Sequence, residues 1–257
     1  MSDLCITEHN AGINSRLASV AGLAEGHVHI WRLEPEPEVE LSRYFRLLDS
    51  DEQDRARRFR FPNLTRNFIV DHGRLRLLLG AYTQSRPEDL VFARNEFGKP
   101  VLANPALTNH RLHFNLSHTK GLTLLAVCLG SEVGIDVEAV RPMDDWQGIA
   151  LSHFSPRENA ALQSTIESDR QNGFFRCWTR KEAFLKANGL GLSKPLDLFA
   201  VSLAADEFPE LLSCEWDSQA TSRWSLVSLA LGPEFVAALA IQRREWTLRF
   251  FDWAGNL

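Results

Sequence analysis

The sequence predicts an α+β fold built from two similar subdomains that meet near residue 133. Each half runs through the same order of patterns, which is an alternating strand, a helix opened by a Ser-x-x-Glu/Gln capping box, a second helix and further strands. The halves share little residue identity, so the order hints at an internal duplication and not at a short repeat. The 257 residues are 44% hydrophobic and 24% charged, as in chains that bury a sizeable core.

The expected domains are a loose segment at 1–26, an N-terminal subdomain at 27–133 and a C-terminal subdomain at 134–257. A net charge of −5 gives no sign of a chain-wide binder of nucleic acid or membrane. No signal-peptide pattern opens the chain, and no apolar run is long enough to span a bilayer. We therefore expect a cytoplasmic protein. Its cysteines form no C-x-x-C pair, which argues against a zinc knuckle: Cys5, Cys128, Cys177 and Cys214.

In the first half, the alternation over His27–Leu33 predicts a half-buried strand, and two prolines soon break the chain. Ser50 followed by Gln53 predicts a capped helix start. The helix that follows is dense in arginine over Arg55–Arg60, and a second helix is expected at Phe68–Leu79 from its helical spacing. Further strands are expected at 90–92, 101–102, 113–118 and 122–129.

In the second half, Val133–Glu138 is typical of another strand. Ser155 and Glu158 form a second capping box, with a proline at the favoured first helical position. A clear helix is expected over Phe174–Ala187, ended by an Asn-Gly pair. The rest of the chain, from Phe199 to Phe251, is predicted to form short strands.

Two acids on the first of these strands are the sharpest chemical feature. Because residues two apart share a face of a strand, Asp136 and Glu138 point the same way. Neighbouring carboxylates repel each other unless a cation lies between them. An exposed face with water over both acids is one interpretation. A hard divalent cation is the other, and oxygen ligands favour Mg²⁺ over zinc.

The Phe174–Ala187 helix carries a third acid. Glu182 lies on a stripe with Phe175 and Trp178, where a lone carboxylate is costly unless it is paired or bound to metal. Lys186 follows one turn later, so a simple helical ion pair is the alternative. That pair does not explain the aromatic neighbours, and a third metal ligand with a phosphate-binding lysine explains them better.

Two further polar clusters stand out. The stretch Asn115–Thr119 ends a strand with Ser117 and His118, whose side chains can contact phosphate oxygens. Adjacent residues on a strand point to opposite faces, so this pair does not indicate a serine hydrolase. The turn Phe97–Pro100 has a glycine that permits a tight bend and a proline that fixes it, which would hold Lys99 out on a stiff loop.

Together these stretches resemble one family, the phosphopantetheinyl transferases of the longer, surfactin-synthetase-activating type. The matching segments, in the family's order and spacing, are Phe97–Leu102, Phe114–Thr119, Gly134–Glu138 and Trp178–Leu192. The resemblance implies a pseudo-dimer of two α+β halves with coenzyme A between them. It implies transfer of 4′-phosphopantetheine from coenzyme A to a serine of an acyl or peptidyl carrier protein, and we expect a monomer.

The resemblance also assigns roles residue by residue. Asp136, Glu138 and Glu182 match the carboxylates that hold Mg²⁺, with Mn²⁺ as an alternative ion. Glu182, Lys186 and His118 match catalytic positions, with Glu182 as the general base. The positions that match coenzyme A-binding residues are Arg55, Arg94, Gly98, Lys99, Pro100, Asn115, Ser117, His118, Asp136 and Lys186.

Two other functions remain open on the same residues. One is a different Mg²⁺-dependent phosphoryl-transfer enzyme that uses the same three acids. The other is a binder of coenzyme A or of carrier proteins that has lost the chemistry. The presence of all three acids and of Lys186 argues against the second.

Overall fold

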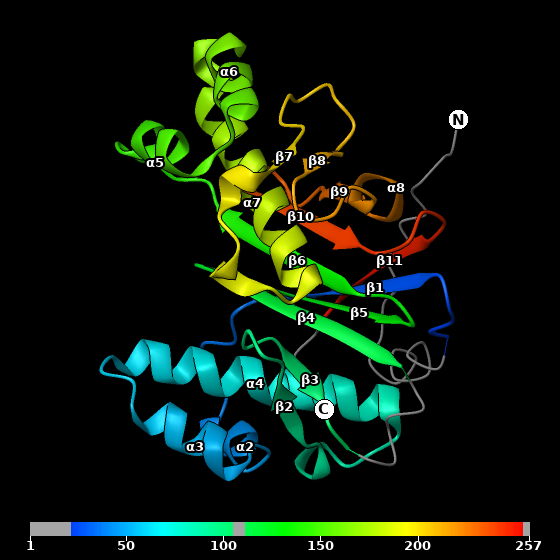
Figure 1. The fold of residues 1–257 in the computed structure, drawn as a ribbon. Coiled ribbons are helices and arrows are strands. Elements are labelled where there is room, and N and C mark those ends of the chain that lie inside the picture. The colour runs from blue at the N-terminus through cyan, green and yellow to red at the C-terminus, as the bar shows by residue number, and fades with distance from the viewer. Residues whose placement is uncertain (1–21, 105–110, 254–257) are drawn as a thin grey trace.

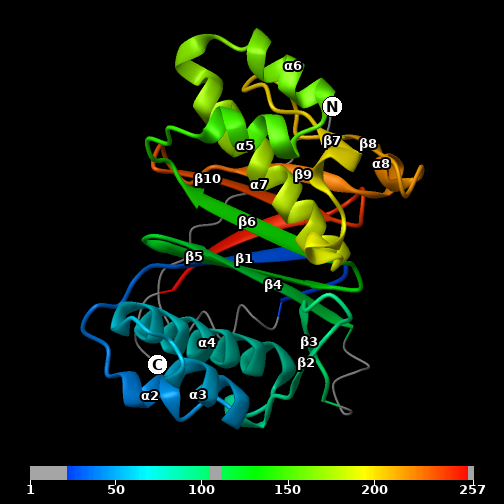
Figure 2. The ribbon, with the colours of Figure 1, turned by 60° about the vertical axis from the view of Figure 1, so that its left-hand side comes forward.

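The structure is a computed structural model that describes residues 22–104 and 111–253. Most of the expected loose segment at 1–26 lies outside the described residues. The described residues stack in layers, from helices α2, α3 and α4 through one sheet and then a second sheet to helices α5, α6 and α7 (Figures 1 and 2). The α+β prediction is therefore confirmed.

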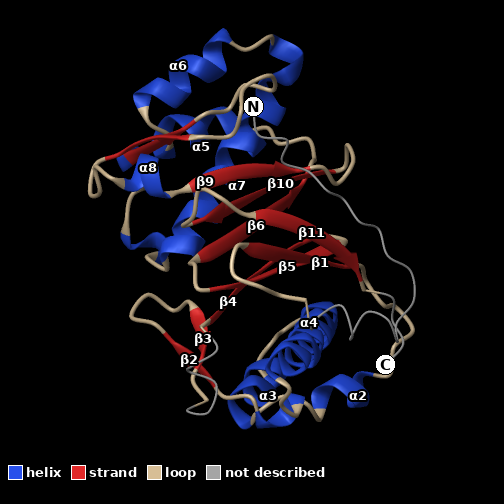
Figure 3. Cartoon of the chain, turned by 90° about the vertical axis from the view of Figure 1, so that its right-hand side faces the viewer, coloured by secondary structure: helices blue, strands red, loops and turns tan. Residues whose placement is uncertain are grey.

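The elements of the first half follow the predicted order. The helices are α2 (Leu41–Phe45), α3 (Ser50–Arg57) and α4 (Pro62–Thr83). The strands are β1 (His27–Leu33), β2 (Phe92–Arg94), β3 (Pro100–Leu102), β4 (Leu112–Thr119) and β5 (Leu122–Leu129). Figure 3 shows α4 lying along the first sheet, with α2 and α3 beyond it.

The second half repeats this order with additions. The helices are α5 (Trp146–His153), α6 (Pro156–Ser164), α7 (Arg170–Asn188) and α8 (Ala220–Arg223). The strands are β6 (Val133–Ala139), β7 (Phe199–Val201), β8 (Leu211–Cys214), β9 (Ser225–Leu229), β10 (Phe235–Ile241) and β11 (Thr247–Asp252). Short 3-10 turns lie at 87–89, 167–169, 191–193 and 196–198.

The two main sheets pack face to face. One has the order β11-β1-β5-β4 and the other the order β6-β10-β9. Alternate apolar residues of β1, β5, β6 and β10 fill the space between them, and α4 and α7 cover the two outer faces with apolar clusters of their own. The edge strands β4 and β6 lie side by side, so the two halves meet along them.

Two helix starts test the capping predictions. Ser155 and Glu158 form the predicted box, and the helix begins at the proline between them. The first start is shifted by one residue. Asp49, not Ser50, is the N-cap, and Glu52, not Gln53, closes the box. Both residue pairs suit the motif, and only the backbone decides between them.

The last strand departs from the simple division of the chain. β11 pairs in parallel with β1, while β5 pairs with the other edge of β1 in the antiparallel direction. A strand from the expected domain at 134–257 thus completes the sheet of the domain at 27–133. The boundary near residue 133 stays a prediction. None of the described helices is long and apolar enough to cross a membrane.

Candidate active site

A glycine brings α7 onto the strand that carries two of the acids. A Cβ at Gly134 would lie 2.2 Å from the Ala183 carbonyl oxygen and 2.3 Å from the Ala187 nitrogen. No other residue type fits there, because real Cβ atoms do not approach backbone so closely. The helix therefore packs directly on β6, with Lys186 over Asp136, the next residue on the same face of the strand.

Asp136 is the centre of this contact and is only 5% exposed. Its Oδ1 accepts a 2.6 Å hydrogen bond from Lys186 Nζ and a 3.0 Å bond from Ser117 Oγ. The Lys186 ammonium also donates to Ser117 Oγ at 3.0 Å. The other carboxylate oxygen of Asp136, Oδ2, is buried and has no hydrogen-bond partner. A buried acceptor without a partner is costly, so this atom points to a donor or cation that the side chains do not supply.

The other two acids lie within electrostatic reach of Asp136. Burial and then Asp136 raise the pKa of both Glu138 and Glu182. Among the described residues, no three His, Cys, Asp or Glu side chains already form a metal-binding group. The donor set is nonetheless all oxygen, it contains the unpartnered Oδ2, and its acids repel one another. A hard divalent cation would relieve each of these costs, so the residues fit one.

Two side chains of β4 fasten it to β6. Asn115 Oδ1 accepts a 2.8 Å hydrogen bond from the Ile135 backbone nitrogen, and Thr119 Oγ1 accepts one of 3.0 Å from Ala139 nitrogen. Ser117 lies between these two ties on the same face of β4 and therefore reaches Asp136. In this structure Asn115 serves as a backbone tie.

His118 faces away from this cluster. It is exposed and lines a cavity of about 240 Å³ together with Asp71 of α4. Its cross-strand partner Thr123 donates a 3.1 Å hydrogen bond from Oγ1 to Asp71 Oδ2. The structure thus brings Ser117, Asp136 and Lys186 together and leaves His118 on the opposite face of the edge strand.

The Phe97–Pro100 turn differs from the sequence expectation. Gly98 has a positive φ of 90° at its tip, and Arg94 Nη1 donates to the Gly98 carbonyl at 2.9 Å. Lys99, however, is not held out in solvent. Its side chain is only 9% exposed and forms a 2.7 Å ion pair with Glu132. Pro100 opens β3 directly after it.

Arg55 lies at the start of a stack of rings. Its guanidinium lies 5.0 Å from the ring centre of Phe68, which in turn stacks on His72 at 3.9 Å. Burial, then Arg94 and Arg58, lower the pKa of Arg55. Three arginines therefore gather beside the turn, and such a group attracts an anion.

Comparison with known proteins identifies the family. The model of the 4′-phosphopantetheinyl transferase superfamily matches residues 132–240, and that of the 4′-phosphopantetheinyl transferase N-terminal region matches residues 31–130. The 4′-phosphopantetheinyl transferase HetI of Nostoc sp. is 37% identical over 90% of this chain and 94% of its own length. The chain belongs to the 4′-phosphopantetheinyl transferases.

Two other transferases of the family support this membership. The transferase ffp of Bacillus subtilis is 30% identical over 68% of this chain and 78% of its own. The transferase Sfp of Bacillus subtilis (strain 168) is 29% identical over 67% of this chain and 74% of its own. The resemblance inferred from the motifs is therefore confirmed at the level of the family.

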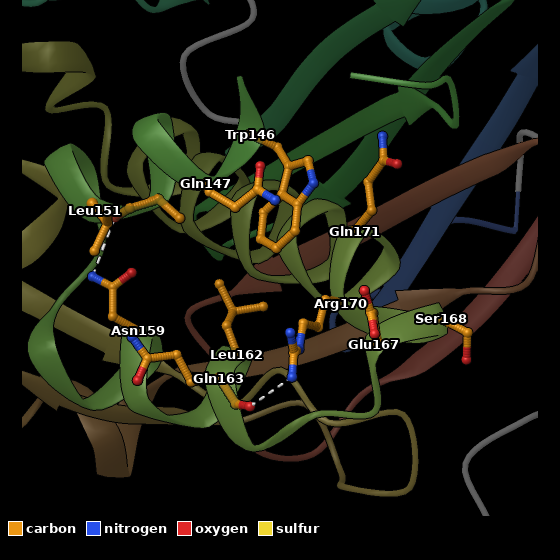
Figure 4. Close-up of a pocket in the computed structure, with 11 residues that line it drawn as sticks. Trp146, Gln147, Leu151, Asn159, Leu162, Gln163, Glu167, Ser168, Arg170 and Gln171 are labelled. Atoms are coloured by element: carbon orange, nitrogen blue, oxygen red, sulfur yellow. Dashed lines mark hydrogen bonds between the residues drawn. The ribbon is translucent and has the colours of Figure 1, made fainter. Parts of the chain in front are cut away.

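A second cavity of this transferase lies away from the acids. It has a volume of about 400 Å³ and is formed by α5, α6 and the start of α7. Figure 4 shows Trp146 and Leu162 among the side chains that surround it, with Arg170 hydrogen-bonded to Gln163. None of the predicted site residues lines this cavity.

Sequence reasoning missed three residues around the site. They are Glu132, which pairs with Lys99, Asn95, which binds the end of α7, and Asp71, which faces the cavity of His118. Each acts on a partner distant in the sequence. Asp71 alone had a local signal, since it is an acid that directly follows the buried apolar run Phe68–Val70.

Proposed function

We propose that this transferase moves 4′-phosphopantetheine from coenzyme A to a serine of an acyl or peptidyl carrier protein. The observation that carries the proposal is the cluster of Asp136, Glu138, Glu182 and Lys186 where α7 packs on β6. Three acids and a lysine at one point suit a diphosphate and its cation.

Asp136, Glu138 and Glu182 would hold Mg²⁺, with Mn²⁺ as an alternative. The ion supplies charge neutralisation for the diphosphate oxygens. Lys186 gives one of its donors to the phosphates, and Ser117 orients that ammonium through their 3.0 Å hydrogen bond. His118 would add a donor from the opposite face of β4.

In the reaction, the serine oxygen forms a bond to the β-phosphorus of coenzyme A. The bond from that phosphorus to the leaving oxygen breaks, and 3′,5′-ADP departs. The serine proton passes to Glu182, directly or through a water. Glu182 is assigned this role because it belongs to the acid cluster at which the diphosphate would bind.

The nucleotide end lies, in this proposal, at the turn that contains Gly98 and Pro100. Arg55 and Arg94 provide positive charge for the 3′-phosphate. The arginine segment Arg55–Arg60 also attracts carrier proteins, which are usually acidic around the modified serine. We further propose that the protein acts as a monomer in the cytoplasm.

The test is intact-protein mass spectrometry of an apo carrier protein incubated with this protein, coenzyme A and Mg²⁺. We expect a gain of one phosphopantetheine arm, lost with EDTA and lost with a Ser→Ala carrier. Release of 3′,5′-ADP without labelling would indicate a different phosphoryl-transfer enzyme. Calorimetric binding of coenzyme A without turnover on any fatty-acid or peptidyl carrier would indicate a binder.

A further inference from the structure

The turn after β2 is fastened to the far end of α7, although the two belong to different halves. Lys99 Nζ donates to the Ala187 carbonyl at 2.9 Å, to the Val133 carbonyl at 3.2 Å and to Glu132 Oε2 at 2.7 Å. An ammonium has three donors, and all three are used. Lys99 therefore has no free hydrogen to offer a phosphate unless one of these contacts breaks.

Glu132 is held as firmly as the lysine. His113 lies 3.2 Å from its Oε1, on the opposite side from Lys99. Hydrogen bonding and charge from His113 and Lys99 outweigh burial and bring the pKa of Glu132 to about 2. This carboxylate is thus ionised at any pH at which the protein works, and the Lys99 pair persists there.

Asn95 makes a second tie without any charge. Its Nδ2 donates to the Gly189 carbonyl at 2.8 Å, while its Oδ1 accepts from the Phe97 and Lys99 nitrogens at 3.0 and 2.9 Å. Gly189 caps α7 with a φ of 65°, and a Cβ there would lie 2.5 Å from Asn95 Nδ2. The turn and the helix end are therefore in direct contact.

These hydrogen bonds fix the turn relative to Lys186, the lysine proposed to bind phosphate. Ala187, which accepts from Lys99, directly follows Lys186 in the last turn of α7. Val133, which also accepts from Lys99, opens the strand of Asp136. The distance between the turn and the acid cluster is thus set by side chains of Asn95, Lys99 and Glu132.

We propose that Glu132 and Asn95 are positioning residues for the nucleotide end of coenzyme A, and that Lys99 fastens the turn and does not bind phosphate. The inference rests on the proposed function, because it takes the turn as the nucleotide end. A turn held at a fixed distance from Lys186 presents Gly98 and Pro100 to the nucleotide in one place. Loss of that preorganisation weakens binding without removing any contact to the ligand.

The test compares two ligands by calorimetry in the presence of Mg²⁺. One is 3′,5′-ADP, which contains the nucleotide, and the other is inorganic pyrophosphate, which does not. We expect each of three variants to lower the affinity for 3′,5′-ADP about tenfold: Glu132→Ala, Asn95→Ala and Lys99→Met. Pyrophosphate should keep its affinity in all three variants, and Glu245→Ala, at an exposed glutamate, serves as the matched control.

A lysine that contacts phosphate directly would give a different pattern. In that case Glu132→Ala would free the Lys99 ammonium and leave the affinity for 3′,5′-ADP unchanged or higher. Asn95→Ala would not change that affinity. Either result overturns the positioning role, as does an equal loss of both ligands. If the unmodified protein binds neither ligand, the proposed function itself fails, and this inference fails with it.

Discussion

The two halves place a long helix on a strand in the same way but fill that interface differently. In the first half, β1 turns His29, Trp31 and Leu33 toward α4, where Tyr82 accepts a 2.9 Å bond from the Trp31 indole. In the second half, β6 turns Gly134, Asp136 and Glu138 toward α7. One interface is a closed core, and the other is a cluster of acids.

The frame around each interface is shared. Glu52 closes the capping box of α3 and binds Arg76 of α4 at 2.6 Å, just as Glu158 closes the box of α6 and lies 2.8 Å from Lys181 of α7. The difference teaches that the duplicated frame is structural and that the chemistry depends on a few positions. A glycine and two acids on one strand distinguish the half in which we propose the diphosphate site from the other half.

The largest effect is expected from closing the gap beside β6. Gly134→Ala should cost about 5 kcal/mol or more, because the new Cβ would meet the backbone of α7. The measurement is chemical unfolding followed by circular dichroism. A normal stability of Gly134→Ala would contradict the close packing of α7 on β6.

Removing one acid should separate activity from stability. Asp136→Asn should lower turnover at least about a thousandfold, or about 4 kcal/mol, because the fit for the cation is lost. Its unfolding midpoint should change little. Trp31→Phe, at the matching place on β1, should do the opposite, with lower stability and normal turnover in the carrier assay. Near-normal turnover of Asp136→Asn would remove the cation from the mechanism.

The two box-closing glutamates should differ in cost. Glu158→Ala leaves Lys181 charged and fully buried, and we expect a loss of about 3 to 4 kcal/mol in unfolding free energy. Glu52→Ala should cost about half as much, because Arg76 keeps the Asp49 carboxylate as a partner. Lys181 keeps only the backbone carbonyls of Leu196 and Phe199. Urea titrations of both variants measure the difference, and equal losses would contradict it.

Acid should destabilise the closed interface through His29. Burial, helped by Arg249 and His27, lowers the pKa of His29 from 6.5 to about 4. Between these values the unfolded chain takes up a proton that the folded chain does not. The contribution of the neutral His29 to the free energy of unfolding is therefore fully present above pH 6.5. It falls by about 3 kcal/mol as the pH drops to 4. Unfolding titrations across this range should show a smaller fall in His29→Gln.

Most of the correct predictions came from local sequence patterns. The Gly134–Glu138 strand, the helix through Glu182 and Lys186 and the Ser155 capping box follow from periodicity and cap chemistry, which depend only on near neighbours. What could not be predicted depends on distant partners. Lys99 was expected in solvent because its acceptors, Glu132 and Ala187, come from segments that only the fold brings to the turn.

The orientation of His118 lies between these cases. Strand alternation already indicates that Ser117 and His118 point apart, yet the family motif groups them as one phosphate-binding pair. The structure places the two side chains on opposite faces of β4, so the phosphate-binding role of His118 stays a prediction. The partner of His118 across the cavity, Asp71, depends on how α4 lies on the sheet and has no motif of its own.

The parallel pairing of β11 with β1 has a consequence for how the chain is made. The first sheet lacks its edge strand β11 until Thr247–Asp252 have left the ribosome, although its other strands emerge far earlier. During synthesis, one row of β1 backbone groups therefore stays unpaired, and an unpaired strand edge can form hydrogen bonds with other chains. A ribosome that stops before residue 247 would release a first half that is unfinished, and the two halves could not be produced separately by cutting the gene near residue 133.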